Sequence, residues 1–359
     1  MKQGRSITDL AAEIQRQAAT KVDMVAPTGA INLFVPEGTK DVRMSFRNGD
    51  PVPGGYEIAP LAHRQMGERL GIPAKYYEKM LSSAPDLLVS NVRRWFDDEP
   101  EKRLVRVLDG RVRAFLSDRY QRIDNIHVAE TALPALMGVP GVEIVSCEVT
   151  PHKLYIKAVT HAVRAEVRSK RVGDIVEAGV IISNSEVGLG AVNVNPFFNF
   201  LACLNGMIRA KAGMRSAHVG TKLDGDDDLA LLLADDTKAI LDRGVMLKVR
   251  DVIAAAMDEV RFKEAIEVLQ GTTAQKLRGD PAEAVVVLAN EFVLNDVQRV
   301  SVLRHLIEGA DLSRYGLIQA VTATAENQED YDEATRLEAL GGRLLDLPAQ
   351  QWEKIAEAA

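Results

Sequence analysis

The residues best suited to bind a charged ligand are lysines and arginines gathered in the middle third of this 359-residue chain. In the stretch KLYIKAV, Lys153, Tyr155 and Lys157 alternate with apolar residues, so a β-strand would direct these three side chains to one face. The stretch 209–222 carries several cations and no acidic residue. Cations spread over strands and their connections can neutralise a row of phosphates, so this region predicts a polyphosphate partner.

We expect a common groove built from cations of four segments. Its predicted DNA-binding residues are Arg106, Arg113, Lys153, Lys157, Arg164, Arg168, Lys170, Arg171, Arg209, Lys211 and Arg215. The alternative is that these cations pair with acids nearby, since Asp109, Asp118 and Asp124 lie close to the first two arginines in sequence. Aromatic residues make up only 5% of the chain, which favours contact with phosphates over stacking on bases.

A tight hairpin is predicted at Asp109-Gly110, because glycine tolerates the positive φ that a type I′ turn requires. With a two-residue loop, Val107 would lie opposite Val112, and Arg106 opposite Arg113. Two guanidinium groups side by side destabilise a sheet unless a negative group lies between them. The hairpin therefore predicts an anionic neighbour, either a ligand or an acidic side chain.

Charge is distributed unevenly along the chain, whose net value is −7. Lysine and arginine number 20 against 20 acidic residues in 1–150, 10 against 4 in 151–222, and 14 against 27 in 223–359. A basic middle followed by an acidic end is typical of a protein whose basic part meets an anionic partner.

The order of hydrophobic patterns predicts an α+β fold, with a central antiparallel β-sheet flanked by helices and a mostly helical C-terminal part. We expect three regions. They are a mostly helical segment 1–100, an antiparallel, basic, β-rich core 101–222, and an acidic helical region 223–359. Strict alternation of strand and helix is missing, which argues against a doubly wound nucleotide fold.

Motifs for common enzyme chemistry are missing from the sequence. The chain has no phosphate-binding P-loop, no H-E-x-x-H and no G-x-S-x-G, and its six histidines and two cysteines, Cys147 and Cys203, lack metal-ligand spacing. We therefore expect no cofactor, no metal and no enzymatic activity. A metal-dependent nuclease using Asp118 and Asp124 is a minor alternative. No apolar run is long enough for a signal or a membrane span, so a cytoplasmic location without membrane contact is predicted.

Several motifs resemble those of the phage- and plasmid-like proteins defined by a domain of unknown function. The matching segments, over roughly residues 20–350, are LGIPAKYYEKML at Leu70, VRAFLSDRYQRIDN at Val112, ISNSEVGLGAVNV at Ile182, CLNGMI at Cys203, HVG at His218, GLIQAVTATA at Gly316 and RLEALGGRLLDL at Arg336. The family implies an origin in a mobile element. Its helix-flanked sheet is also similar in outline to single-strand annealing proteins of the Redβ and RecT type.

The resemblance and the cations together suggest a non-enzymatic protein that binds single-stranded DNA for annealing or recombination, as a homo-oligomer. The alternative is a structural or protein-interaction module with no nucleic-acid role, in which acidic helices contact the basic sheet of a neighbouring copy. The motif residues also have a purely structural interpretation: Asn184, Gly188 and Asn205 suit turns, and Arg119 and Tyr120 suit local packing.

Overall fold

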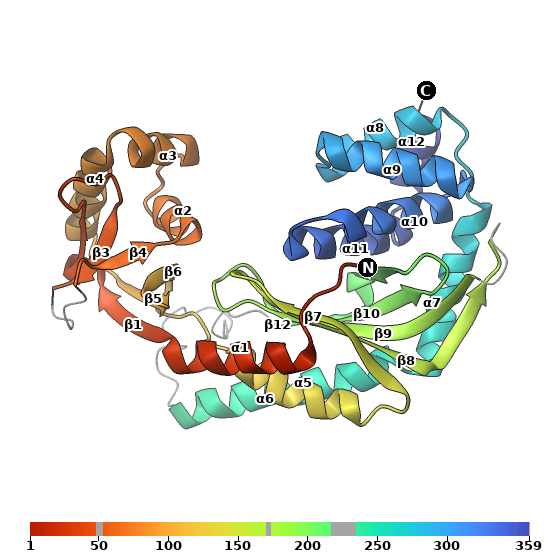
Figure 1. Cartoon of the computed structure of the whole chain (residues 1–359), viewed down its shortest axis with the longest axis horizontal. Coiled ribbons are helices and arrows are strands. Elements are labelled where there is room, and N and C mark those ends of the chain that lie inside the picture. Colours follow the sequence, from red (N-terminus) through yellow and green to blue (C-terminus); the bar gives the residue numbers. More distant parts are fainter. Residues whose placement is uncertain (48–52, 170–173, 217–234, 359) are drawn as a thin grey trace.

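The computed structural model describes residues 1–47, 53–169, 174–216 and 235–358. Two largely antiparallel sheets are each covered by helices, and a helical region follows them, which confirms the predicted α+β class (Figure 1). The first sheet and its helices form the first lobe. The second sheet and the C-terminal helices that lie on one of its faces form the second lobe (Figure 1).

The first sheet has the strand order β1-β5-β6-β4-β3-β2, in which only β4 and β6 run parallel. Its strands are β1 (Val22–Pro27), β2 (Ile31–Phe34), β3 (Arg43–Phe46), β4 (Tyr56–Ile58), β5 (Lys102–Leu108) and β6 (Arg111–Ser117). It is covered by α2 (Pro60–Arg69), α3 (Ala74–Ser83) and α4 (Pro85–Asp98). Strands from both sides of residue 100 share this sheet, so the predicted boundary there does not separate two structural units.

The β5–β6 hairpin has the predicted turn, with positive φ at Asp109 (52°) and Gly110 (74°). Val107 lies opposite Val112, as expected, but a β-bulge follows and places Arg106 opposite Ala114. The predicted register of Arg106 with Arg113 is therefore wrong, because the bulge inserts one extra residue into β6.

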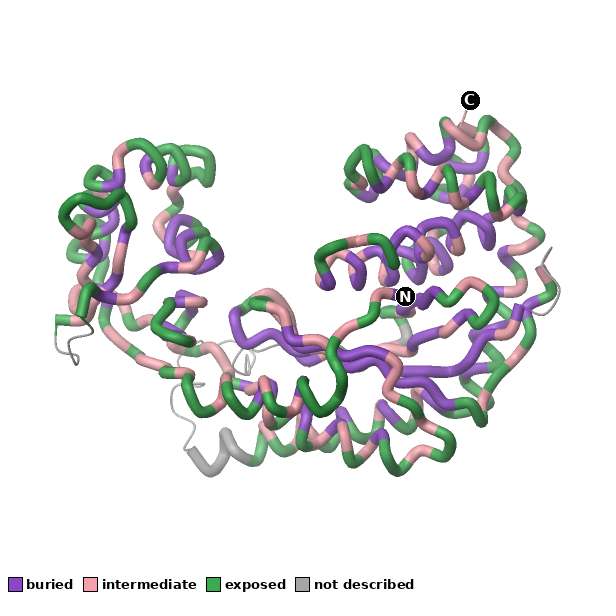
Figure 2. The backbone as a smooth tube through the Cα atoms, viewed as in Figure 1, coloured by how far each residue is buried: buried purple, intermediate pink, exposed green. Residues whose placement is uncertain are grey.

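The second sheet has the order β11-β10-β9-β8-β7, with β12 also paired to β10. Its strands are β7 (Val142–Val149), β8 (Leu154–Val167), β9 (Asp174–Asn184), β10 (Val192–Phe200), β11 (Asn205–Ile208) and β12 (Met214–Ser216). The strands carry long buried runs because helices lie on both faces (Figure 2). One face packs on α1 (Ile7–Thr20), α5 (Asn125–Met137) and α6 (Asp235–Ala256).

Alternation along β8 divides the two faces as the sequence predicts. Leu154 and Ile156 enter the core with α5, and we call their side the α5 face. Tyr155 packs with Tyr331 of α11 (Tyr331–Leu345), and we call this side the α11 face. The face predicted to be basic and open is therefore covered by a helix from the C-terminal region.

The C-terminal helices pack on the far ends of β8, β9 and β10 and on one another. They are α7 (Glu259–Gly271), α8 (Pro281–Phe292), α9 (Asp296–Gly309), α10 (Arg314–Thr324), α11 and α12 (Ala349–Ala356). Helices α6 and α7 are separate, and Asp258 caps α7 by accepting from the backbone amide of Arg261 at 3.0 Å.

His63, on α2 in the core of the first lobe, gives that lobe a dependence on pH. Its side chain is buried and contacts the Tyr77 hydroxyl at 2.9 Å, and burial, aided by Arg111, lowers the pKa of His63 to about 4. Between pH 6.5 and 4 only the unfolded chain binds this proton, so the stabilisation present above pH 6.5 is lost as the pH falls.

We expect this group to cost about 2 kcal/mol of unfolding free energy at pH 5 relative to pH 7. Urea unfolding of the wild type and of His63→Asn at both values measures it. The variant keeps a polar partner for Tyr77 but does not titrate, so it should lose less stability. Equal losses in the two proteins would contradict the assignment.

Candidate functional site

Arg106 lies inside the protein, at the joint between the two sheets. Its side chain is 0% exposed, and its guanidinium lies 2.9 Å from the Asp23 carboxylate and 2.7 Å from that of Asp124. It also donates to the backbone carbonyl of Glu186 at 2.9 Å. We call Lys21, Asp23, Arg106, Arg113, Asp124 and Glu186 the joint cluster.

The positive and negative side chains of the joint cluster pair with one another. Burial lowers the pKa of Arg106, but Asp23 and Asp124 outweigh burial and raise it above the usual value. Burial raises the pKa of Asp124, but Lys21 and Arg106 outweigh this effect and hold it below its usual value. The anionic neighbour that the hairpin predicts is therefore supplied by the chain itself, and the buried side chain of Arg106 is not accessible to DNA in this structure.

Arg113 is also paired with a carboxylate of the same chain. It forms an ion pair with the Glu186 carboxylate, which also accepts a hydrogen bond from the backbone N–H of Asn125 at 2.7 Å. Glu186 is buried and comes from the turn after β9, so this carboxylate ties β6 and the start of α5 to the second sheet. The charge of Arg113 is therefore paired within the chain, and its predicted contact with DNA stays a prediction.

The SDRY and NSEVG motifs meet at this joint. The Tyr120 hydroxyl donates to the Ser185 carbonyl at 2.8 Å, and the Asn184 amide donates to the Ile123 carbonyl at 3.0 Å. Gly188 has φ +81°, and a Cβ there would lie 2.6 Å from Leu116. These residues shape the contact between the lobes, which favours the structural interpretation of both motifs.

Lys157 is also buried, on the α11 face. Its side chain is 0% exposed, with Nζ 2.6 Å from Oε2 of Glu338, itself fully buried on α11. Burial raises the pKa of Glu338, and Lys157 opposes that shift. Lys157 therefore pairs α11 with the sheet, and its buried side chain is not accessible to DNA in this structure.

Arg209 follows β11 and forms an ion pair with Asp346, at 2.9 Å, just after α11. Both side chains are largely buried. A carboxylate from the C-terminal region therefore already pairs with Arg209, whose predicted phosphate contact stays a prediction.

Five predicted cations stay accessible and, within the described residues, lie in no ion pair: Lys153, Arg164, Arg168, Lys211 and Arg215. Lys153 lies just before β8, at the end near the joint, and Arg215 shares the α11 face through the register Arg215–Asn193–Ser183–Tyr155. Arg164 is eleven residues farther along the chain, about 35 Å from Lys153 in an extended strand. Lys170 and Arg171 lie outside the described residues.

No helix in the described ranges is both long and apolar enough to span a membrane. Among the same residues, no group of three or more His, Cys, Asp or Glu side chains is placed to hold a metal ion. Asp124, one of the two carboxylates of the alternative nuclease site, is engaged by Lys21 and Arg106 in the joint cluster.

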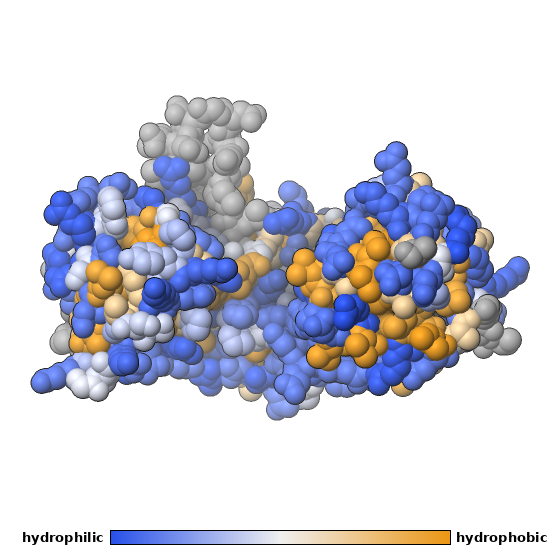
Figure 3. Space-filling model, turned by 90° about the horizontal axis from the view of Figure 1, so that it is seen from above, coloured by the Kyte–Doolittle hydropathy of each residue, from blue (hydrophilic) through white to orange (hydrophobic). Residues whose placement is uncertain are grey.

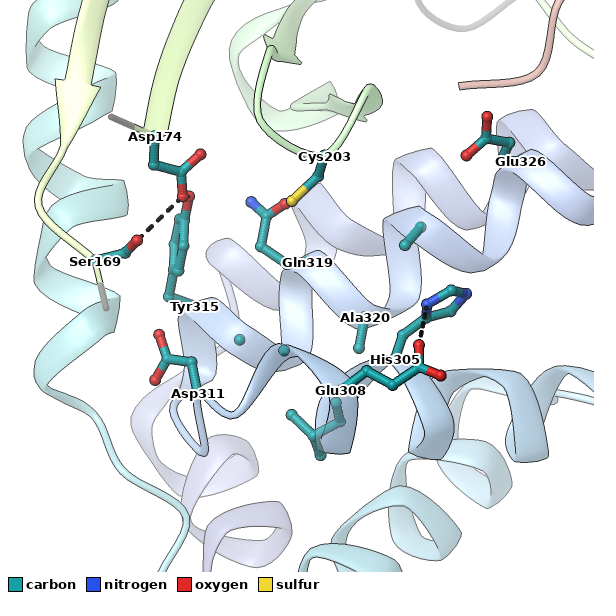
Figure 4. A pocket seen from close by; sticks show the side chains of 14 residues that line it. Ser169, Asp174, Cys203, His305, Glu308, Asp311, Tyr315, Gln319, Ala320 and Glu326 are labelled. Carbon is teal, nitrogen blue, oxygen red and sulfur yellow. Dashed lines mark hydrogen bonds and ion pairs between the residues drawn. The ribbon is translucent and has the colours of Figure 1, made fainter. Parts of the chain in front are cut away.

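A cavity of about 200 Å³ lies among the ends of β8 and β9, the turn at Cys203, and helices α9 and α10 (Figure 4). Tyr315 and Ser169 both donate to Oδ2 of the buried Asp174, the first residue of β9. Gln319 points toward the cavity from α10 (Figure 4). This cavity is one concave site of the C-terminal region to which polar side chains contribute.

Sequence reasoning missed this site, although one signal for it was available. Gln319 is a polar residue inside the apolar GLIQAV segment, and Cys203 and Asn205 belong to the CLNGMI segment. The structure brings the two segments together, since the Asn205 amide donates to Oε1 of Gln319 at 3.0 Å. Asp174 carried no such signal, because its role depends on Tyr315, which lies 141 residues away.

No protein-family model, curated protein or solved structure matches this chain. The resemblance to the phage- and plasmid-like proteins therefore stays a prediction made from the motifs.

We expect Arg106→Leu to lower the free energy of unfolding by about 3 kcal/mol or more, because it leaves partly buried carboxylates without their partner. Chemical denaturation of the variant beside the wild type measures the loss. The control is Arg94→Leu, which removes an exposed cation paired with Asp98 at 2.7 Å and should change stability by about 0.5 kcal/mol or less. Similar effects of both substitutions would show that the joint cluster is not a structural centre.

Proposed function

We propose that this chain is a non-enzymatic interaction module that works as an assembly of identical copies joined through helix α9. The observation that carries the proposal is an exposed apolar stripe on that helix. Val297 is 77% exposed, Val300 62% and Ile307 62%. Apolar residues gather over the C-terminal helices on the right of Figure 3. Exposed apolar residues grouped on one helix face are typical of a contact surface.

The stripe follows helical spacing. Val297, Val300, Arg304 and Ile307 are separated by three or four residues, so they share one face of α9, while Val302 and Leu306 face the core. The seven-residue step from Val300 to Ile307 is also the repeat with which two helices pack side by side. A second helix can therefore lie along this face.

Val293, in the turn before α9, extends the stripe and supports its role. It is 82% exposed and adopts the left-handed conformation, with φ 53° and ψ 56°. A β-branched residue in this conformation is strained, and such strain collects at functional positions. Glycine or asparagine would suit the turn better, so an exposed valine there is best explained by a contact.

The charges on α9 select a second copy of this chain as the partner. If two copies of α9 pack antiparallel about Val300, Ile307 of one lies near the start of α9 in the other, just after the turn that contains Val293. The same register places Asp296 opposite Arg304, and two-fold symmetry repeats this contact. Asp296 is almost fully exposed, and Arg304 lies in no ion pair among the described residues. The face is therefore complementary to itself in both hydrophobicity and charge.

The 14 residues of α9 span about 21 Å, so one helix pair is smaller than a standard stable interface. We therefore expect association that depends on protein concentration. We also propose that the protein works in the cytoplasm, as the sequence predicts.

We expect Val300→Asp to abolish association, because the two substituted carboxylates would face each other across the symmetry axis. Light scattering coupled to size exclusion, over a series of protein concentrations, measures the mass. Val260→Asp on α7 is the matched control, since Val260 is equally exposed, at 65%, but lies off the stripe. An unchanged mass in the first variant, or an equal loss in the second, would refute the contact.

The ion pairs have a separate test. Asp296→Arg and Arg304→Asp should each weaken association about tenfold by opposing like charges, whereas the double variant should restore it. Failure of the double variant to recover, with both single variants folded, would remove the argument for a second copy. The loss of the internal Asp296–Arg299 pair, at 3.1 Å, cannot produce such recovery.

Binding of single-stranded DNA is the second candidate function, and it is favoured by the accessible cations Lys153 and Arg215. They lie at the same end of the second sheet, next to the joint. Figure 3 shows hydrophilic residues over the hollow between the lobes. A backbone of phosphates could follow that hollow without a base-reading element.

We expect Lys153→Ala with Arg215→Ala to weaken binding of an oligonucleotide and to reduce the slope of log affinity against log salt by about 1.4, for two lost phosphate contacts. Filter binding over a salt series measures both. The control is Lys75→Ala with Lys79→Ala, which removes the same charge from α3. Binding that is undetectable at low salt, or equal losses in both variants, would contradict this function.

A further inference from the structure

A second cavity, of about 460 Å³, lies in the first lobe beside the core histidine His63. Its described lining comes from the loop before β3 and from β3, β4, β6, α2 and α3. Cavities of this size are typical of sites for small organic molecules. The charges and donors of the lining indicate which class of molecule this cavity fits.

Lys40 and Arg111 bring two unpaired positive charges to the cavity. Both residues are exposed, and neither forms an ion pair with a described residue. Arg43 and Glu57, which also line the cavity, pair with each other at 3.4 Å. Asp41 is the remaining carboxylate of the described lining. The unpaired cations therefore outnumber the unpaired carboxylate, so these side chains attract an anion.

His63 adds a hydrogen-bond donor from the core side of the cavity. It is 7% exposed, and its Nδ1 contacts the Tyr77 hydroxyl at 2.9 Å. Its Nε2 has no hydrogen-bond partner among the described residues and is not fully enclosed, so a ligand in the cavity can reach it. Burial, aided by Arg111, lowers the pKa of His63 to about 4, so the ring carries one proton at pH 7. With Tyr77 donating to Nδ1, that proton lies on Nε2.

The combination of these groups selects a phosphate monoester. A monoester is largely a dianion at pH 7, so its charge matches the two unpaired cations, and its oxygens accept several hydrogen bonds. A phosphate within a DNA strand is a diester with a single charge, and the strand continues on both sides of it. Val42, Ile58 and Leu81 form an apolar wall of the cavity, against which the organic part of a small ligand fits.

We propose that this cavity binds a small phosphate monoester. The phosphate accepts from the Lys40 ammonium, from the Arg111 guanidinium and from Nε2 of His63, and the organic part lies against the apolar wall. The site lies in the first lobe, whereas the proposed contact between copies lies on α9. Either proposal can therefore fail without the other.

The test uses the full chain, with phenyl phosphate as the probe and phenol as its uncharged counterpart. Calorimetric titration at pH 7 measures affinity, and NMR of the His63 ring nitrogens locates the probe. We expect phenyl phosphate to bind at least tenfold more tightly than phenol and to shift the Nε2 resonance. Equal affinity for the two, no binding of phenyl phosphate at millimolar concentration, or an unshifted Nε2 would overturn the proposal.

Two variants identify the cations that bind the phosphate. Lys40→Gln and Arg111→Gln each remove one charge but keep a polar side chain, and each should weaken phenyl phosphate binding about tenfold. The control is Arg93→Gln, which removes an exposed cation from α4, outside the lining, and should leave binding unaltered. Circular dichroism confirms folding of each variant. Full binding by both cavity variants would place the probe elsewhere and refute the site.

A single-stranded oligonucleotide without a terminal phosphate separates the two sources of phosphate. It contains only diesters, so we expect it not to displace phenyl phosphate from the cavity. Displacement by the oligonucleotide, at a concentration that saturates any other site, would assign these cations to nucleic acid and would overturn the proposal of a monoester.

Discussion

A buried positive charge is stable only beside a negative one, and this constraint organises the contacts between the parts of the molecule. At the joint cluster, Arg106 is surrounded by Asp23 and Asp124 and reaches the Glu186 carbonyl. These partners come from β1, from the start of α5 and from the turn after β9. The guanidinium of Arg106 therefore helps to hold the first lobe against the second sheet, together with the Arg113–Glu186 ion pair and the hydrogen bond from Tyr120 to the Ser185 carbonyl.

The same constraint fixes the C-terminal helices. Lys157 on β8 pairs with Glu338 on α11, and Arg209 after β11 pairs with Asp346 at the end of that helix. The acidic character of the last third of the chain thus serves partly to neutralise the basic middle within a single copy. The alternative hypothesis placed this contact between neighbouring copies, whereas two of the contacts lie inside one chain.

The pairing reduces the excess positive charge of the middle third, from which a polyphosphate partner is predicted, but does not eliminate it. Lys153 and Arg215 stay accessible at one end of the sheet, and Arg164 and Arg168 at the other. The C-terminal helices carry a surface feature of another kind, namely the apolar stripe on α9. This stripe favours contact through apolar packing.

Local patterns in the sequence determined the elements. The Asp109-Gly110 turn, the alternation along β8 and the α+β class follow from short-range sterics and periodicity, which act within a few residues. The sequence also indicated that Arg106 and Arg113 need an anionic neighbour.

Only the tertiary structure decided which neighbour that is. Asp23 lies 83 residues before Arg106, and Glu338 lies far from Lys157, so spacing could not reveal either pair. The bulge in β6 moved Arg106 out of its predicted register, and α11 covered a face that alternation alone left open. Burial and charge pairing are set by segments distant in sequence, and for that reason the choice between a phosphate groove and an internal ion pair required the fold.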